Sequence, residues 1–222
     1  MLYKNNKIPN INARDFATIL GLNPYQTAYE LLEDKIEKKH LFFGNKFTDH
    51  GIRYENLAIK SFEKYIGLCI HDEQVKVTHS EHNWITGRLD GILQEEEEKC
   101  GKRKRYKQLC VIEVKCPLKD DRVDELNEDN VPIQYWCQCQ VYMNLIDCDF
   151  AYYIEYYIKP NDDPKNAKLY TVKIRRNKDW WNVSLPKIIL FYEEIKFYHE
   201  KKSLDTHPVR ITENKWKNKF TL

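Results

Sequence analysis

The feature that most limits how this chain can fold is an apolar run at positions 111–117, Val-Ile-Glu-Val-Lys-Cys-Pro, which contains two opposite charges. Such a run favours a strand, and alternation along a strand places Glu113 and Lys115 on one face, about 7 Å apart along the backbone. Ile112 and Val114 then point to the opposite face. A charge in so apolar a run is costly unless it is paired or holds a metal ion. Two interpretations follow: a structural salt bridge on a half-buried strand, or a metal-binding carboxylate beside a catalytic lysine.

Length and composition indicate one globular domain over residues 1–222, with 42% hydrophobic and 32% charged residues. The net charge of +2 creates no overall field toward nucleic acid, so a DNA-binding surface has to be local. No apolar run approaches the roughly 20 residues that span a bilayer, and the first residues lack the apolar core of a signal peptide. We therefore expect an intracellular protein. The seven cysteines include no C-x-x-C pair, which argues against a structural zinc or iron–sulfur site.

Hydrophobic periodicity predicts a chain that mixes helices and strands. Apolar residues at helical spacing predict helices at about 12–21, 24–39, 46–66, 131–145 and 179–199. Alternating or continuous apolar runs predict strands at about 68–77, 84–93, 111–117, 150–158 and 169–174. We expect Asn12 to cap the first helix, Pro24 to lie in the first turn of the second, and Pro186 to kink or split the last.

Two charge blocks separate the strands predicted at 84–93 and 111–117. Four glutamates occupy positions 95–98, and basic residues follow from Lys99 to Lys107. Opposite charge blocks between two strands are typical of an exposed hairpin loop. The loop could contact a phosphate backbone, but a solvated loop is the simpler interpretation.

Three polar residues lie near predicted apolar faces. Glu55 stands at the margin of the apolar stripe of the helix at 46–66, and Asp90 follows a strand and precedes a glycine. Gln138 shares one face of the helix at 131–145 with the residues four positions before and after it. Each of them could be an ordinary surface residue, so the role of each depends on the residues that lie next to it in the fold.

Taken in order, these residues belong to a succession of blocks: INARD at 11–15, GIRYE at 51–55, GRLDG at 87–91, and EVKCP at 113–117 followed by QCQ at 138–140. This succession resembles the PD-(D/E)XK nuclease superfamily, and more closely the phage lambda exonuclease group, the YqaJ-like viral recombinases. The resemblance implies an α/β fold with a restriction-endonuclease-like core, in which a central mixed β-sheet is flanked by helices on both sides. It also implies a viral or phage origin, and therefore the cytoplasm or nucleus of a host cell.

The resemblance also implies a divalent-metal site with one or two Mg²⁺ or Mn²⁺ ions, which prefer hard oxygen ligands. The implied ligands are Asp90, Glu113, Glu55 and the backbone carbonyl of Ile112 or Val114. Lys115 would hold or deprotonate the attacking water and offset charge that builds on the phosphate. Gln138 matches a helical glutamine that orients this lysine or a metal-bound water.

In this family a 5′ phosphate is bound by an arginine and small hydroxyl residues around the first block. Here Lys7 lies where that arginine is expected, Asn12 replaces a threonine and Arg14 replaces a serine. We expect Lys7 and Arg14 to grip the terminal phosphate, with help from the N–H groups at the start of the first helix. Arg88, which points the same way as Asp90 along its strand, is placed in the same DNA-binding set. A solvated basic face is the alternative for this N-terminal region.

The function implied by the resemblance is metal-dependent hydrolysis of linear double-stranded DNA with free ends, in the 5′→3′ direction. The single strands would serve recombination or repair, with a single-strand annealing protein as partner, and relatives form rings of three. Alternatives are an endonuclease or other repair nuclease on the same fold, and a non-catalytic DNA-binding module. Within the single domain we assign 1–45 to the N-terminal helices and phosphate region, 46–158 to the catalytic core, and 159–222 to the C-terminal strand and helix.

Overall fold

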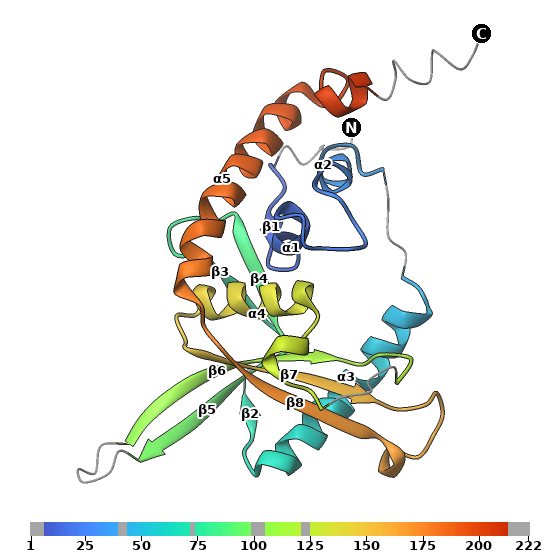
Figure 1. Ribbon diagram of the computed structural model, residues 1–222, viewed down its shortest axis with the longest axis vertical. Coiled ribbons are helices and arrows are strands. Elements are labelled where there is room, and N and C mark those ends of the chain that lie inside the picture. Colours follow the sequence, from blue (N-terminus) through green and yellow to red (C-terminus); the bar gives the residue numbers. More distant parts are fainter. Residues whose placement is uncertain (1–6, 40–43, 72–73, 99–104, 121–124, 213–222) are drawn as a thin grey trace, which may run out of the picture.

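The computed structural model describes residues 7–39, 44–71, 74–98, 105–120 and 125–212, with the backbone alone at 95–98 and 105–108. Helices pack on both faces of mixed β-sheets (Figure 1), so the predicted fold class is confirmed. None of the helices within these ranges combines the length and the apolar character needed to traverse a bilayer.

The strands form two sheets rather than one. The larger sheet has the order β2 (Ile70–His71), β5 (Gly91–Glu98), β6 (Arg105–Lys115), β7 (Phe150–Tyr157) and β8 (Lys168–Arg175). The smaller sheet has the order β1 (Ile11–Asn12), β4 (Ile85–Leu89) and β3 (Val75–Thr78). β6 runs parallel to β7 and β1 runs parallel to β4, whereas all other neighbouring strands are antiparallel.

The strands predicted at 68–77 and 84–93 are each divided between the two sheets, which the sequence analysis did not anticipate. β4 ends at Leu89 and β5 begins at Gly91, so Asp90 stands at the corner between the sheets. A side chain on Gly91 would collide with Ile70 of β2, which explains why this corner needs a glycine. Apolar residues continue on both sides of the corner, and the pattern alone therefore gives no sign of it.

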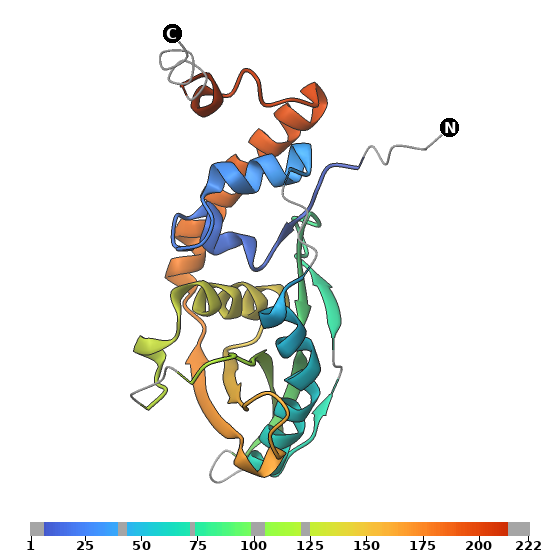
Figure 2. The ribbon, with the colours of Figure 1, turned by 90° about the vertical axis from the view of Figure 1, so that its right-hand side faces the viewer.

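Two helices cover the larger sheet: α3 (Lys46–Ile66) and α4 (Ile133–Leu145). They lie on opposite faces of β6 and β7 (Figure 2). On the α3 side Phe62 packs in one core cluster with Ile112, and on the α4 side Met143 packs in another with Val111. Successive residues of β6 thus contribute to different cores, as strand alternation predicts.

The starts of α3 and of α2 (Ala28–Glu37) are fixed by side-chain caps. Asn45 accepts hydrogen bonds from the first turn of α3, and Gly67 ends that helix with a φ of +71°, so the predicted helix at 46–66 is confirmed. The prediction for Pro24 was wrong, because α2 begins later. Thr27 and Glu30 form a capping box there, which satisfies the N–H groups that a start at Pro24 would leave open.

A second layer beyond α4 consists of α2 with α1 (Asp15–Ile19) and α5 (Lys178–Lys201), and α5 runs from the end of β8 past α1 to α2 (Figure 1). Asn12 does not cap α1. It lies in β1, and Arg14 occupies the cap position without a side-chain hydrogen bond. Pro186 does not split α5, which is one continuous helix. Short 3₁₀ turns are found at η1 (Glu128–Asn130) and η2 (Pro164–Asn166).

The predicted loop at 95–107 is largely a two-stranded hairpin that projects from the body of the protein (Figure 1). Its backbone register pairs Glu96 with Lys107 and Glu98 with Arg105. The two strands therefore extend through the charge blocks. The remaining basic residues, from Lys99 to Lys104, lie outside the described residues.

Candidate active site

Four charged side chains, from α3, from β6 and from the corner between β4 and β5, come together at the carboxyl end of β6. Glu113 and Lys115 form an ion pair between Oε1 and Nζ along one face of the strand. Asp90, at the corner between the sheets, accepts a hydrogen bond from the backbone N–H of Val114 at 2.8 Å. Glu55 reaches the same place from α3, and the charges of Asp90 and Lys115 act on it. The structure therefore brings together four of the five predicted catalytic side chains.

Gln74, which the sequence analysis did not single out, connects two of these carboxylates. Its Nε2 donates to Oε1 of Glu55 and lies 3.5 Å from Oδ1 of Asp90. The first residue pair of the β3–β4 ladder, Val75 with Leu89, places Gln74 across from Asp90. A glutamine between two strands carries no motif, so only the strand register could have revealed it.

Burial and mutual repulsion control the charges of this cluster. Only 1% of Glu113 is exposed, and burial, reinforced by the charge of Asp90, raises the pKa of Glu113 well above its ordinary value. Burial and then the charge of Asp90 also raise the pKa of Glu55. Burial alone would lower the pKa of Lys115, but the charges of Glu113 and Asp90 outweigh it and raise that pKa, so Lys115 stays an ammonium ion.

The donor atoms of this cluster fit a divalent cation. Oε2 of Glu113 is buried without a hydrogen-bond partner, which is costly unless something else compensates for it. Together with Glu55 and Asp90 it offers the carboxylate oxygens that Mg²⁺ and Mn²⁺ prefer. Among the described residues, no three acidic, histidine or cysteine side chains already surround a common point. In the metal-free protein, Lys115 pairs with Glu113, and Gln74 donates to Glu55 and lies near Asp90.

Gln138 lies on α4 and connects to the strand that leads to Asp90. Its Nε2 donates to the hydroxyl of Tyr142 at 2.9 Å, and that hydroxyl donates to the carbonyl of Arg88 at 2.8 Å. A Cβ at Gly87 would lie 2.6 Å from the ring of Tyr142, so glycine allows this close approach. Gln138 is thus hydrogen-bonded to Tyr142, whereas the resemblance implied a contact with Lys115 or a bound water.

A groove of about 1130 Å³ lies over the cluster. α3 contributes Glu55, the end of β6 contributes Val114 and Lys115, and α4 contributes Gln138 and Tyr135. Nζ of Lys115 lies 4.9 Å from the centre of the Tyr135 ring. The side chain of Lys115 keeps 27% of its surface exposed, so it can meet a molecule bound in the groove.

The residues predicted to bind the 5′ phosphate are not all in this groove. Arg14 lines it, with 79% of its side chain exposed. Lys7 and Arg88 are exposed, but neither is among the residues that line the groove in the described part of the chain.

Asn12 and the start of α1 are already engaged in other contacts. Oδ1 of Asn12 accepts a hydrogen bond from Thr86 at 2.9 Å. The backbone N–H of Asn12 donates to Asp15, whose carboxylate also pairs with Lys35 at 2.6 Å. An acidic side chain therefore lies at the start of α1, near the helix N–H groups that we predicted to help bind phosphate.

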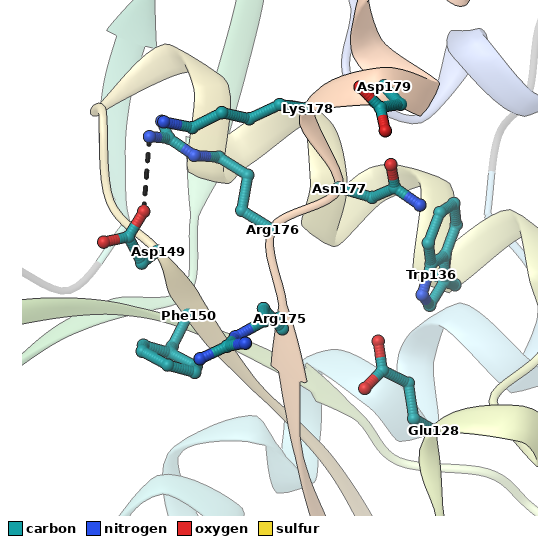
Figure 3. A pocket seen from close by; sticks show the side chains of 9 residues that line it. All are labelled: Glu128, Trp136, Asp149, Phe150, Arg175, Arg176, Asn177, Lys178 and Asp179. Carbon is teal, nitrogen blue, oxygen red and sulfur yellow. Dashed lines mark ion pairs between the residues drawn. The ribbon is translucent and has the colours of Figure 1, made fainter.

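A second pocket, of about 660 Å³, lies between the end of β8 and the start of α5 (Figure 3). Its charged lining residues are balanced in sign: Arg175, Arg176, Lys178, Glu128, Asp149 and Asp179. Arg176 is itself paired with Asp147 at 2.7 Å and with Asp149 at 3.3 Å. This pocket has no excess charge of one sign that would favour phosphate.

The comparison with protein families identifies the chain. A model of the YqaJ-like viral recombinase domain matches residues 3–149. The chain belongs to this family. This YqaJ-like domain is 28% identical over 148 residues to an uncharacterized protein of Acanthamoeba polyphaga mimivirus. The match covers 64% of this chain and 26% of the mimivirus protein, so the chain spans about a quarter of that relative.

Solved structures of exonucleases share the fold of this YqaJ-like domain. An alkaline exonuclease from Laribacter hongkongensis, LHK-Exo, superimposes with a TM-score of 0.64 over 87% of this chain and 91% of its own, at 14% identity. A complex of LHK-Exo with dAMP gives 0.65 over 92% and 95%, at 13% identity. A phage related exonuclease from Haemophilus somnus gives 0.60 over 89% and 96%, at 19% identity.

Proposed function

We propose that this chain is a DNA exonuclease that uses a divalent cation to hydrolyse linear double-stranded DNA from its 5′ ends. The observation that carries the proposal is the convergence of Glu55, Asp90, Glu113 and Lys115 in one cluster. Glu55 and Lys115 of this cluster line the groove. The family membership and the exonuclease neighbours support the same reaction class. The complex of LHK-Exo with dAMP supports a nucleotide product.

In this proposal, side chains of the cluster bind the metal ion, orient the attacking water and stabilise charge on the phosphate. Asp90, Glu113, Glu55 and the carbonyl of Val114 would hold the ion. When bound, Mg²⁺ or Mn²⁺ lowers the pKa of a water and stabilises charge on the phosphate. Lys115 stays protonated beside Glu113, so in the metal-free protein it is a hydrogen-bond donor. We assign it to the phosphate oxygen that gains charge and to the orientation of the attacking water. Gln138 lines the groove, and its hydrogen bond to Tyr142 holds it there.

The finer parts of the function belong to the same proposal. Arg14 contacts the terminal phosphate from the groove rim, and Lys7 approaches it from the N-terminal segment. The product strands serve recombination with an annealing protein, and the active form is a homotrimer in a virus-infected host cell. Kinship with the mimivirus protein supports the viral setting.

The test is digestion of one linear duplex, labelled at the 5′ or the 3′ end and carrying or lacking a 5′ phosphate, with Mg²⁺ or with EDTA, beside a closed circle. We expect metal-dependent loss of the 5′ label, faster with phosphate, while the circle stays intact. A nicked or linearised circle would instead identify an endonuclease. No cleavage with any divalent metal would point to a DNA-binding module.

Arg14 can be tested separately with the same substrates. We expect Arg14→Ala to lower the preference for phosphorylated over unphosphorylated ends, because it removes a charged phosphate contact. An unchanged preference would remove Arg14 from the assignment while leaving the nuclease proposal intact.

A further inference from the structure

Gln74 has a left-handed backbone conformation at the turn that leads into β3. Five non-glycine residues in the described part of the chain have positive φ: Lys38, Gln74, Asp147, Asn161 and Lys202. Lys38 and Lys202 end helices, where this conformation is common, and Asp and Asn adopt it more readily than other residues. Gln74, with a φ of +58°, lies at a turn and not at a helix end, and glutamine adopts this conformation less readily than Asp or Asn. Strained backbone of this kind is often found at functional sites.

The side chain of Gln74 spans two layers of the protein. Its Nε2 donates to Glu55 on α3, and it also lies 3.5 Å from Oδ1 of Asp90 at the corner between the sheets. The left-handed backbone allows the chain to enter β3 while this amide points at both carboxylates. These are two of the carboxylates that the proposed function assigns to the metal ion.

Without a cation, Glu55 and Asp90 repel each other, since each is a partly or largely buried carboxylate in the same cluster. Lys115 is paired with Glu113 rather than with Glu55. The amide of Gln74 is the neutral donor group that reaches both of the repelling side chains. It can hold them together without adding a charge that would compete with the ion.

We propose that Gln74 is a positioning residue, which holds the carboxylates of Glu55 and Asp90 in place in the metal-free protein and thereby sets the affinity of the site for a divalent cation. This inference rests on the proposed function. It predicts that Gln74 acts on metal binding, before DNA is present, and that its effect on cleavage disappears when the metal saturates the site.

The experiment measures Mn²⁺ binding to the full-length protein without DNA, by electron paramagnetic resonance of the free ion. Gln74→Met keeps the length of the side chain but has no donor. Gln74→Asn keeps the amide but shortens the side chain by one methylene, so the amide no longer reaches the carboxylates. Asparagine tolerates the left-handed backbone, so this variant preserves the fold. The matched control is Gln26→Met, because Gln26 also donates to a carboxylate, that of Asp34 at 2.8 Å, away from the cluster.

We expect both Gln74 variants to bind Mn²⁺ about 10–100-fold more weakly, the usual effect of losing a group that orients metal ligands. The Mg²⁺ concentration for half-maximal cleavage should rise by the same factor, while the rate at saturating Mg²⁺ and the behaviour of Gln26→Met stay at wild-type values. Unchanged Mn²⁺ affinity in the folded variants overturns the role of Gln74, whether or not the saturated rate falls. If the wild-type protein neither binds Mn²⁺ nor cleaves DNA with metal, the proposed function fails as well, and the two failures are thereby distinguished.

Discussion

Glu113 and Lys115 compensate each other's charge inside the protein. Glu113 is almost completely buried and its Oε2 lacks a hydrogen-bond partner, while Oε1 pairs with Lys115. Removing either group leaves the other without its compensating charge in a poorly solvated place. The pair is therefore also a structural salt bridge, so the two interpretations of the strand at 111–117 do not exclude each other.

We expect Lys115→Ala to reduce the cleavage rate by about 10²–10⁴-fold, the range for loss of a group that transfers or orients a proton. The chain should still fold, because the raised pKa of Glu113 lets that carboxyl group accept a proton once the lysine is gone. Cleavage rates and thermal unfolding measured together test this. Lys64→Ala, an exposed lysine on α3, is the control. Normal turnover by Lys115→Ala would exclude the lysine from the mechanism.

His79 gives the protein a pH dependence of stability that does not involve the candidate active site. Its Nδ1 accepts hydrogen bonds from the backbone N–H groups of Glu81 and His82, both at 3.1 Å, and its ring stacks on Trp181. Burial, followed by the neighbouring His82, lowers the pKa of His79 below the ordinary value of 6.5. Its neutral form is therefore favoured in the folded state, and its contribution to stability is full above pH 6.5 and is lost as the pH falls below that value.

The melting temperature of the wild-type protein should therefore decrease between pH 7.5 and pH 5.5. His79→Asn provides an uncharged acceptor for the same two N–H groups and should show a smaller decrease. Equal decreases in the two proteins would show that other groups, such as His50, cause the pH dependence.

At the scale of helices and strands, the contact between α4 and β4 depends on Gly87. A methyl group at this position would meet the ring of Tyr142 at 2.6 Å and push it away from the carbonyl of Arg88. We expect Gly87→Ala to lower the free energy of unfolding by about 1–3 kcal/mol, as overpacking usually does. Cleavage should also slow, because Gln138 is hydrogen-bonded to the displaced ring.

Gly51→Ala is the matched control for this prediction. Gly51 lies inside α3 with nothing within 4 Å of an added Cβ, so alanine should raise stability by about 0.5–1 kcal/mol through helix propensity. Chemical denaturation of the two variants should therefore give changes of opposite sign. A destabilised Gly51→Ala would mean that the methyl group itself, and not the contact with Tyr142, is harmful.

The helices and strands differ in how well the sequence predicts them. The helix at 46–66 was predicted correctly because its apolar stripe and both of its ends are local signals. The division of the strands around Asp90 was not predicted, since it depends on which strands pair across the chain. Motif resemblance singled out Glu55, Asp90, Glu113 and Lys115, and the structure places them together, although their roles stay predictions. Gln74 was missed because only the β3–β4 register brings it to Asp90.

At the scale of the whole molecule, the segment after α5 folds back onto α2, and Arg210 makes several of the contacts. Arg210 donates to Glu37 at 2.6 Å and 2.7 Å, to Glu33 at 2.8 Å and to the hydroxyl of Tyr29 at 3.1 Å. Its side chain is only 15% exposed. These contacts close the second layer of helices with residues that are far apart in the sequence.

We expect Arg210→Ala to destabilise the protein by about 1.5–3 kcal/mol, since it removes hydrogen bonds between charged groups and leaves Glu33 buried without this partner. The cleavage rate of the folded protein should stay unchanged, because the predicted catalytic side chains come from other elements. Denaturation and activity measured on one sample test both statements, with Lys187→Ala on the exposed side of α5 as control. An activity loss without a stability loss would place Arg210 in the substrate path.

Asp90 is the single residue between a strand of one sheet and a strand of the other. Any fluctuation that swings the two sheets apart must therefore pull this carboxylate away from Val114 and from Glu55 on α3. Under the proposed function, a separation of the two sheets would therefore remove a metal ligand from the site. We expect cleavage to be lost during gradual heating before any spectroscopic signal from unfolding of the helices appears.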